Sequence, residues 1–156
     1  VKAVVSETPR LSGVDGKAKM SKSLNNAIFL SDSPEDIEKK VMQMYTDPTH
    51  VKVSDPGKVE GNVVFQYLDI FDEDKSKVAE LKAQYEQGGL GDVVIKQRLI
   101  AVLNDVLGPI REKREALARD PKRIMELLKA GTEKAREEAR KTMDEVKRAL
   151  KIGYFE

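Results

Sequence analysis

The sequence predicts a mainly α-helical protein, a helical bundle that follows a short strand and a loop. Beyond residue 33, apolar residues recur at spacings of three and four positions, the period of a helix with one buried face. Residues typical of helix starts and ends flank several of these stretches. Only residues 1–5 form a short apolar run typical of a strand, which Pro9 would soon end. One strand is not stable alone, so it would need a sheet that this sequence does not supply.

The first expected helix begins at Ser33, whose hydroxyl can cap it, with Pro34 at the first helical position. We expect Asp47-Pro48 to end this helix. The residues expected to form its buried stripe are Ile37, Val41, Met44 and Tyr45.

A loop is expected over residues 47–61, where two prolines and two glycines interrupt any periodic pattern. A short apolar helix follows, and its apolar residues are Val64, Phe65, Tyr67, Leu68 and Phe71. The next helix has Val78, Leu81 and Tyr85 on one face, and Gly88-Gly89 should stop it.

A longer helical pattern covers residues 92–117, where Gly108-Pro109 must kink or break it, since proline lacks a backbone donor. Its apolar side comprises Ile95, Leu99, Val102, Leu103 and Val106. We then expect a short helix capped by Asp120, which ends near Gly131 and has Ile124, Leu127 and Leu128 on its apolar face. Thr132 should cap a last helix, whose inward-facing residues are Ala135, Ala139, Met143, Val146 and Leu150.

Composition excludes several classes of site. Cysteine is absent, so disulfides and cysteine zinc sites are excluded. The single histidine, His50, leaves no multi-histidine metal site and no Ser-His-Asp triad, and no metal site of the protein is expected. No apolar run approaches the ~18 residues of a membrane span, and no signal peptide is recognisable. We therefore expect a cytoplasmic protein without a membrane partner.

Positive charge is concentrated in the C-terminal third. Residues 111–151 contain 14 basic and 9 acidic residues, although the net charge of the whole chain is only +1. Such a region can bind RNA, but composition alone favours an ordinary solvated helix face with ion pairs. Candidate RNA-binding residues rest on charge alone, and they are Arg111, Lys113, Arg114, Lys122 and Arg123.

Two lysines three positions apart lie in a polar loop, LSGVDGKAKMSKSLNN. Lysine is a compact point charge suited to phosphate oxygens, so Lys19 and Lys22 together suit a triphosphate. Glycines before them and Asn25-Asn26 after them are expected to give the loop conformational freedom. Two lysines in a polar loop do not by themselves establish a site, because such loops usually have no specific role.

The surrounding sequence resembles the tryptophanyl branch of the class I aminoacyl-tRNA synthetases, whose signature is KMSKS. Besides KMSKS, the resemblance extends over GVDGKAKMSKSLNNAIFLSDSPEDIEKKVMQMYTDP, DPGKVEGNVVFQYLDIF and YEQGGLGDVVIKQRLIAVLNDVLGPIREKRE. The related tyrosyl enzymes share the KMSKS region and stay an alternative, but MYTDP and EGNVVFQYLDIF favour the tryptophanyl branch.

The resemblance implies activation of tryptophan by ATP with Mg²⁺, followed by transfer of the acyl group to tRNA(Trp), in a homodimeric full-length enzyme. By the family pattern, Lys19 and Lys22 are catalytic and contact the ATP phosphates, with Lys22 the stronger candidate for transition-state stabilisation. Met20 would anchor the loop. The remaining residues implied at the ATP site are Ser21 and Ser23, which shape the loop, and Gly13 and Asp15, which precede it.

The sequence departs from the family pattern in two places. Asn25 stands where glycine is usual, although asparagine tolerates the left-handed conformation. No HIGH-type motif (His-X-Gly-His) is present. We therefore expect residues 1–30 to be the end of a catalytic domain left over from the nucleotide-binding fold, and residues 31–156 to be a helical connective and anticodon-binding domain.

Such a chain should be inactive alone, and its state as a monomer or dimer stays open. The rival hypothesis is a helical RNA-binding module without catalysis, in which an intact KMSKS string would have no purpose. A protein-interaction module would need an exposed apolar face, and the sequence suggests none that the core would not bury.

Overall fold

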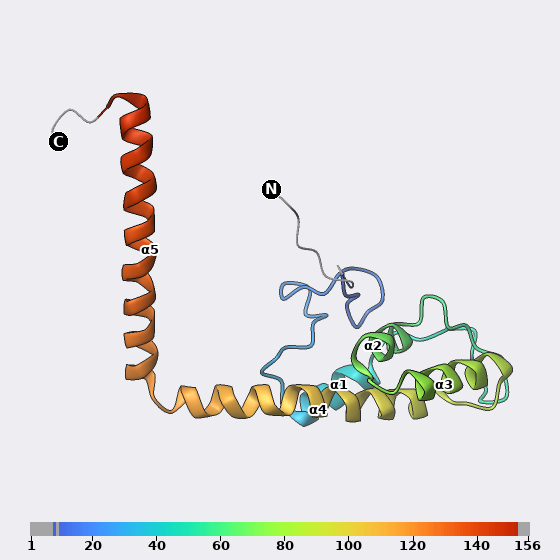
Figure 1. The fold of residues 1–156 in the computed structure, drawn as a ribbon. Coiled ribbons are helices and arrows are strands. Elements are labelled where there is room, and N and C mark those ends of the chain that lie inside the picture. The colour runs from blue at the N-terminus through green and yellow to red at the C-terminus, as the bar shows by residue number, and fades with distance from the viewer. Residues whose placement is uncertain (1–7, 9, 153–156) are drawn as a thin grey trace. The chain divides into compact units, whose positions relative to one another are not determined.

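The computed structural model describes residue 8 and residues 10–152, and this part of the chain contains five helices. They are α1 (Pro34–Met42), α2 (Val63–Phe71), α3 (Lys75–Gln87), α4 (Asp92–Ala118) and α5 (Pro121–Leu150) (Figure 1). The described residues contain no β-strand, only an isolated antiparallel bridge between Ser12 and Lys19. The mainly α class is confirmed, and the strand expected at residues 1–5 lies outside the described residues.

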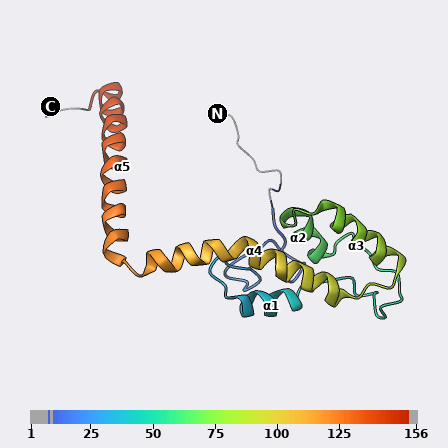
Figure 2. The ribbon, with the colours of Figure 1, turned by 60° about the horizontal axis from the view of Figure 1, so that its bottom comes forward.

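The chain divides into two compact units, residues 1–111 and residues 112–156. The hydrophobic core lies in the first unit, where α1 lies on one side of α4 and both α2 and α3 lie on the other (Figure 2). The largest fully buried side chains are Ile37, Val41, Val64, Phe65, Leu68, Tyr67, Tyr85, Ile95 and Leu99. These residues come from α1, α2, α3 and α4, so the packing of these four helices supports the N-terminal loop.

Helix caps occur at most of the expected places. The Ser33 hydroxyl accepts a hydrogen bond from the Asp36 N–H at the start of α1. Gly88, with φ of 87°, follows α3 in a conformation that favours glycine. Side-chain oxygens cap three other helices in the same way, from Asn62 for α2, Asp74 for α3 and Asp120 for α5.

The first helix is shorter than expected, because α1 ends at Met42 instead of continuing to Asp47-Pro48. Met44 is buried as predicted, but from the segment after the helix, and Tyr45 is exposed. The Tyr45 N–H donates to the Val14 carbonyl at 2.9 Å, so the chain leaves the helical path to pair with the N-terminal loop.

Proline does not interrupt α4, which runs through Gly108 and Pro109 as one helix. The loss of one backbone donor at Pro109 is therefore tolerated inside a 27-residue helix. The buried face of α4 differs from the predicted one at one residue, because Leu107 is buried and Val106 is exposed.

The two C-terminal helices that were expected form one helix, α5, so the prediction of a break at Gly131 was wrong. A glycine inside a helix costs about 1 kcal/mol relative to alanine, which does not by itself end a helix. The Thr132 hydroxyl donates to the Leu128 carbonyl at 2.7 Å, a bond made inside a continuing helix instead of at a cap.

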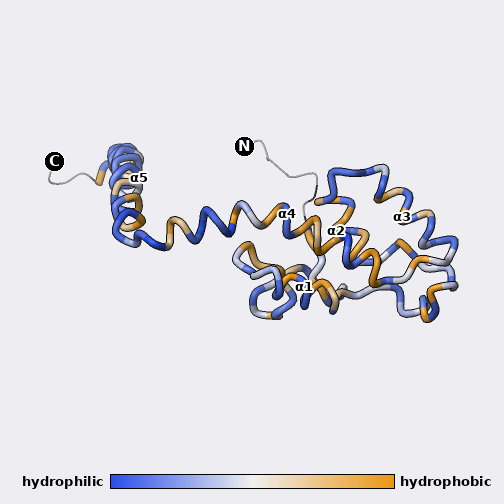
Figure 3. Tube along the Cα trace, turned by 90° about the horizontal axis from the view of Figure 1, so that it is seen from below, coloured by the Kyte–Doolittle hydropathy of each residue, from blue (hydrophilic) through white to orange (hydrophobic). Residues whose placement is uncertain are grey.

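The expected inward face of α5 was also wrong, because none of its residues is buried. Figure 3 colours α5 hydrophilic along most of its length, with hydrophobic residues between the polar turns. The exposed residues of the expected stripe are Ala135, Ala139, Met143, Val146 and Leu150. Periodicity gives the spacing of an apolar face but not the element that would cover it.

Candidate functional site

The loop with the two lysines packs on α2 and on the hydrophobic core of the first compact unit. The Tyr67 hydroxyl of α2 donates to the Ser12 carbonyl at 2.6 Å, and burial raises the pKa of Tyr67 to about 12, so the donor proton stays in place. Met20 is partly buried against the hydrophobic core, together with Leu11 and Val14. This packing is consistent with the anchoring role expected of Met20.

Backbone hydrogen bonds close the loop on itself. The Gly13 N–H donates to the Ala18 carbonyl at 2.8 Å, and the Met20 N–H donates to the Leu11 carbonyl at 3.0 Å. At Gly16, φ is 67° and an added Cβ would lie 2.9 Å from the Tyr45 ring. Both the positive φ and the close ring therefore require glycine at this position.

Asn26 lies at the centre of the loop and is only 3% exposed. Its side-chain oxygen accepts from the Ser21 N–H at 2.8 Å, and its amide nitrogen donates to the Lys19 carbonyl at 3.3 Å. The same nitrogen donates to the Asp15 carboxylate at 3.2 Å. The sequence assigned conformational freedom to Asn26, whereas the structure buries it as a hydrogen-bonding centre.

Gly13 and Asp15 complete this centre. A Cβ at Gly13 would lie 2.2 Å from the amide nitrogen of Asn26, so only glycine fits beside that side chain. Partial desolvation opposes ionisation of Asp15, but hydrogen bonds from Asn26 and from the N–H groups of Lys17 and Ala18 outweigh it and hold its pKa below the ordinary value. Asp15 is therefore an ionised acceptor within the loop.

Lys19 and Lys22 are both exposed, and within the described residues neither ammonium group makes an ion pair or hydrogen bond. The hydroxyls of Ser21 and Ser23 lie 3.0 Å apart beside them. Two unneutralised ammonium groups on one short loop are available to an anion that arrives from solvent.

The turn after the lysines contains the residue that replaces the usual glycine. Asn25 has φ of 52°, the left-handed conformation that asparagine was expected to tolerate, and its N–H donates to the Lys22 carbonyl at 3.2 Å. The departure from the family pattern therefore leaves the turn intact.

We expect Asn25→Gly to leave the stability of the chain unchanged and Asn25→Val to lower it by about 1–2 kcal/mol, because a β-branched residue is strained at positive φ. Urea denaturation of the two variants and the wild type provides the measurement. Equal stability of the valine variant would contradict this account of the turn.

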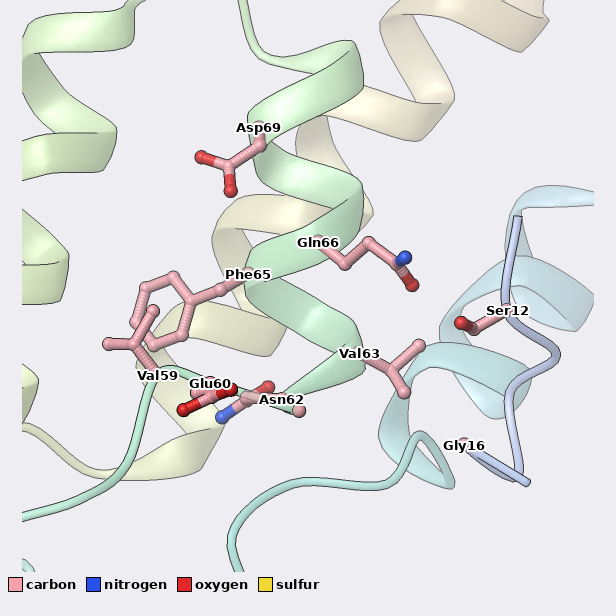
Figure 4. A pocket seen from close by; sticks show the side chains of 10 residues that line it. Ser12, Gly16, Val59, Glu60, Asn62, Val63, Phe65, Gln66 and Asp69 are labelled. Carbon is pink, nitrogen blue, oxygen red and sulfur yellow. The ribbon is translucent and has the colours of Figure 1, made fainter. Parts of the chain in front are cut away.

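An open cavity of about 410 Å³ lies between the loop and the start of α2. Figure 4 shows Ser12 and Gly16 on one side of it, and Val63, Gln66 and Asp69 projecting from α2. Its charged lining residues, Glu60 and Asp69, are acidic, and neither lysine lines it. The Asp69 carboxylate is paired with Lys82 at 2.6 Å, and the lining includes no cationic side chain that could bind a phosphate.

His50, which the sequence left without a role, belongs to a polar cluster that joins the 47–61 loop to α4. Its Nδ1 lies 3.2 Å from Asp92 Oδ1, which also accepts from the Tyr85 hydroxyl at 2.7 Å. The other carboxylate oxygen of Asp92 accepts from Thr46 at 2.8 Å. All of these bonds lie inside the first unit, so the cluster holds Thr46 and His50 against α3 and α4.

The basic candidates differ in their surroundings. Arg111 is partly buried, and its guanidinium donates to the Asp32 carbonyl and to the Asn104 side chain, each at 3.2 Å. The others are exposed and form no ion pair within the described residues, and they are Lys113, Arg114, Lys122 and Arg123. Arg111 thus already has a structural role, which the other four lack.

The described residues offer neither a metal cluster nor a membrane span. They contain no group of three or more His, Cys, Asp or Glu side chains that could hold a metal ion. They also contain no helix that is both long enough and apolar enough to span a bilayer.

Comparison with known proteins gives a consistent family. A family model described as tRNA synthetases class I (W and Y) matches residues 2–108. The tryptophan–tRNA ligase of Lactococcus lactis is 55% identical over 148 residues, which are 94% of this chain and 43% of that protein. The enzyme of the same name from Streptococcus pneumoniae is 52% identical over 148 residues. The chain therefore spans less than half the length of these relatives.

Solved structures agree with the sequence matches. A tryptophanyl-tRNA synthetase from Campylobacter jejuni, solved with ADP and tryptophan, has a TM-score of 0.78 and 31% identity, covering 96% of this chain and 46% of that one. The tryptophanyl-tRNA synthetase from Giardia lamblia has a TM-score of 0.61 and 29% identity, covering 67% of this chain and 27% of that one.

Proposed function

Because this chain belongs to the class I tRNA synthetases of the W and Y group, we propose that it is part of a tryptophan–tRNA ligase. In this proposal residues 1–30 complete the catalytic domain, and residues 31–156 form a helical connective and anticodon-binding domain. The observation that carries the proposal is the KMSKS loop with two exposed lysines, in a chain 55% identical to a tryptophan–tRNA ligase.

The proposed reaction begins with attack of the tryptophan carboxylate on the α-phosphorus of ATP, which forms tryptophanyl-adenylate and releases pyrophosphate. Negative charge grows on the leaving pyrophosphate, and the ammonium groups of Lys19 and Lys22 stabilise it there. The Ser21 and Ser23 hydroxyls hydrogen-bond to each other at 3.0 Å, which leaves one of their two protons to donate to a phosphate. A ribose hydroxyl at the 3′ end of tRNA(Trp) then attacks the tryptophanyl carbonyl, which forms an ester and releases AMP.

Magnesium is proposed to accompany ATP as a substrate complex. Since the described residues offer no cluster of metal-ligating side chains, the ATP phosphates would hold the ion, and no step on this chain is assigned to it. The family resemblance also suggests a homodimeric, cytoplasmic full-length protein, for which light scattering of that protein is the direct test of subunit number.

The second compact unit is proposed to bind tRNA(Trp) near its anticodon. The exposed basic residues Lys113, Arg114, Lys122 and Arg123 support this, because they lack ion-pair partners within the described region. Arg111 stays in the candidate set on charge alone, since its guanidinium already holds Asp32 and Asn104.

We expect the chain to bind tRNA with a tryptophan anticodon more tightly than the same tRNA with a scrambled anticodon, at equal salt concentration. Specific RNA recognition reads unstacked loop bases, and each misread base costs about 1–3 kcal/mol by analogy with base readout elsewhere. Fluorescence anisotropy with both tRNAs measures the difference. Salt dependence alone would not suffice, because any basic surface loses affinity with salt.

The control variant for this experiment is Lys77→Ala, which removes a lysine that already pairs with Glu80 on α3. Arg123→Ala should weaken binding of the tryptophan tRNA, whereas Lys77→Ala should not. The proposal would be contradicted if both tRNAs bound with equal affinity and Arg123→Ala changed neither affinity. The basic residues would then be an ordinary solvated surface.

A further inference from the structure

We propose that Asn26 is a positioning residue for the two lysines, a role that rests on the proposed function of the loop. In this proposal, the buried amide of Asn26 fixes the backbone from which Lys19 and Lys22 extend, so that both ammonium groups are presented to the same triphosphate.

The hydrogen bonds of Asn26 reach both peptide units that flank Met20. The carbonyl that Asn26 holds belongs to the Lys19–Met20 peptide, and the N–H belongs to the Met20–Ser21 peptide. One side chain therefore fixes the orientation of both peptide planes around Met20. The Met20 N–H is held as well, by the Leu11 carbonyl at 3.0 Å. With these planes fixed, the backbone on either side of Met20 cannot rotate freely.

Asn26 is itself held in one orientation. Its amide nitrogen is assigned to the side of Asp15 and the Lys19 carbonyl, which are both acceptors, and its oxygen to the Ser21 donor. The reverse orientation would place the amide oxygen against two acceptors and the nitrogen against a donor. The backbone of Asn26 is also fixed, because its carbonyl accepts from the Val14 N–H at 2.9 Å.

The partners of Asn26 all lie in the loop, at residues 14, 15, 19 and 21. None of these hydrogen bonds reaches α1, α2, α3 or α4, which contribute most of the core. Loss of the Asn26 amide should therefore disturb the geometry of the loop much more than the packing of the core. This separates a positioning role from a general contribution to stability.

The test uses Asn26→Asp in the full-length protein. An aspartate keeps an acceptor for the Ser21 N–H, but it places a carboxylate against the Asp15 carboxylate and the Lys19 carbonyl. We expect kcat for tryptophan-dependent pyrophosphate exchange to fall about ten- to a hundredfold, since small misplacement of reacting groups has effects of this size. The KM for tryptophan should be unchanged, because Asn26 acts on the phosphate end.

Two variants sharpen this result. Asp15→Asn combined with Asn26→Asp restores a donor–acceptor pair between positions 15 and 26, so it should recover part of the lost kcat. Gln84→Glu makes the same amide-to-acid change at an exposed position of α3, and it should leave kcat unchanged.

A double-mutant cycle with Lys22→Ala decides between positioning and simple destabilisation. If Asn26 acts through the lysines, Asn26→Asp should reduce kcat by a smaller factor in the Lys22→Ala background than in the wild type. Asn26→Asp could instead reduce kcat by the same factor in both backgrounds, or leave kcat unchanged although Lys22→Ala lowers it. Either result would overturn the positioning role of Asn26 but not the proposed function. Unchanged exchange after Lys22→Ala would instead overturn the proposed function on which it rests.

Discussion

Replacement of Lys22 by alanine in the full-length protein should lower the rate of tryptophanyl-adenylate formation about a hundredfold. The Lys22 ammonium group is exposed and makes no ion pair within the described residues, so its charge is available for the departing pyrophosphate. Loss of one preorganised transition-state contact typically costs about 3 kcal/mol. Tryptophan-dependent exchange of pyrophosphate into ATP, measured at saturating substrates, gives this rate.

Lys17→Ala provides the matched control, since Lys17 is an exposed lysine of the same loop that lies outside the KMSKS string. It should leave the exchange rate within about twofold of the wild type, as is usual for exposed residues without such contacts. If Lys22→Ala left kcat unchanged and only raised the KM for tryptophan, its role on the phosphates would be contradicted.

The second large effect is expected for the chain itself, because residues 1–156 alone should form no tryptophanyl-adenylate. The sequence has no HIGH-type motif, and the cavity beside the loop is lined by no cationic side chain that could hold the ATP phosphates. Two lysines without substrate positioning lose the contribution of proximity, which supplies several kcal/mol of catalysis. The exchange assay with this chain at micromolar concentration makes the test.

Circular dichroism of the same sample should show the helical spectrum expected from α1 to α5, so that inactivity cannot be ascribed to unfolding. Exchange clearly above the background without protein would show that residues 1–156 contain a complete active site, contrary to this account.

Most of the helices could be predicted from the sequence because their signals are local. Ser33 with Pro34, and Gly88, act through their own backbone conformation or a neighbouring N–H, and the structure confirms them. The merged helix α5 could not be predicted in this way. Gly131 and Thr132 are compatible with either a break or a continuous helix, and the bond from Thr132 to Leu128 belongs to the continuous one.

Only part of the candidate site could be predicted from the sequence, for a similar reason. Lys19 and Lys22 were recognised through a continuous motif, whereas the place of Asn26 depends on partners up to twelve positions away. The roles of Asp15 and Gly13 become clear only in the folded loop, where both lie against the Asn26 amide. Arg111 shows the converse, because its charge suggested RNA while its guanidinium is engaged with Asp32 and Asn104.

Tryptophan-dependent exchange of pyrophosphate into ATP by the full-length protein, measured in parallel with tyrosine, tests the central claim most directly. The account predicts exchange with tryptophan, strongly reduced by Lys22→Ala, and none above background with tyrosine. Exchange driven by tyrosine, or no exchange with tryptophan by a folded full-length protein, would contradict the assignment of this chain to a tryptophan–tRNA ligase.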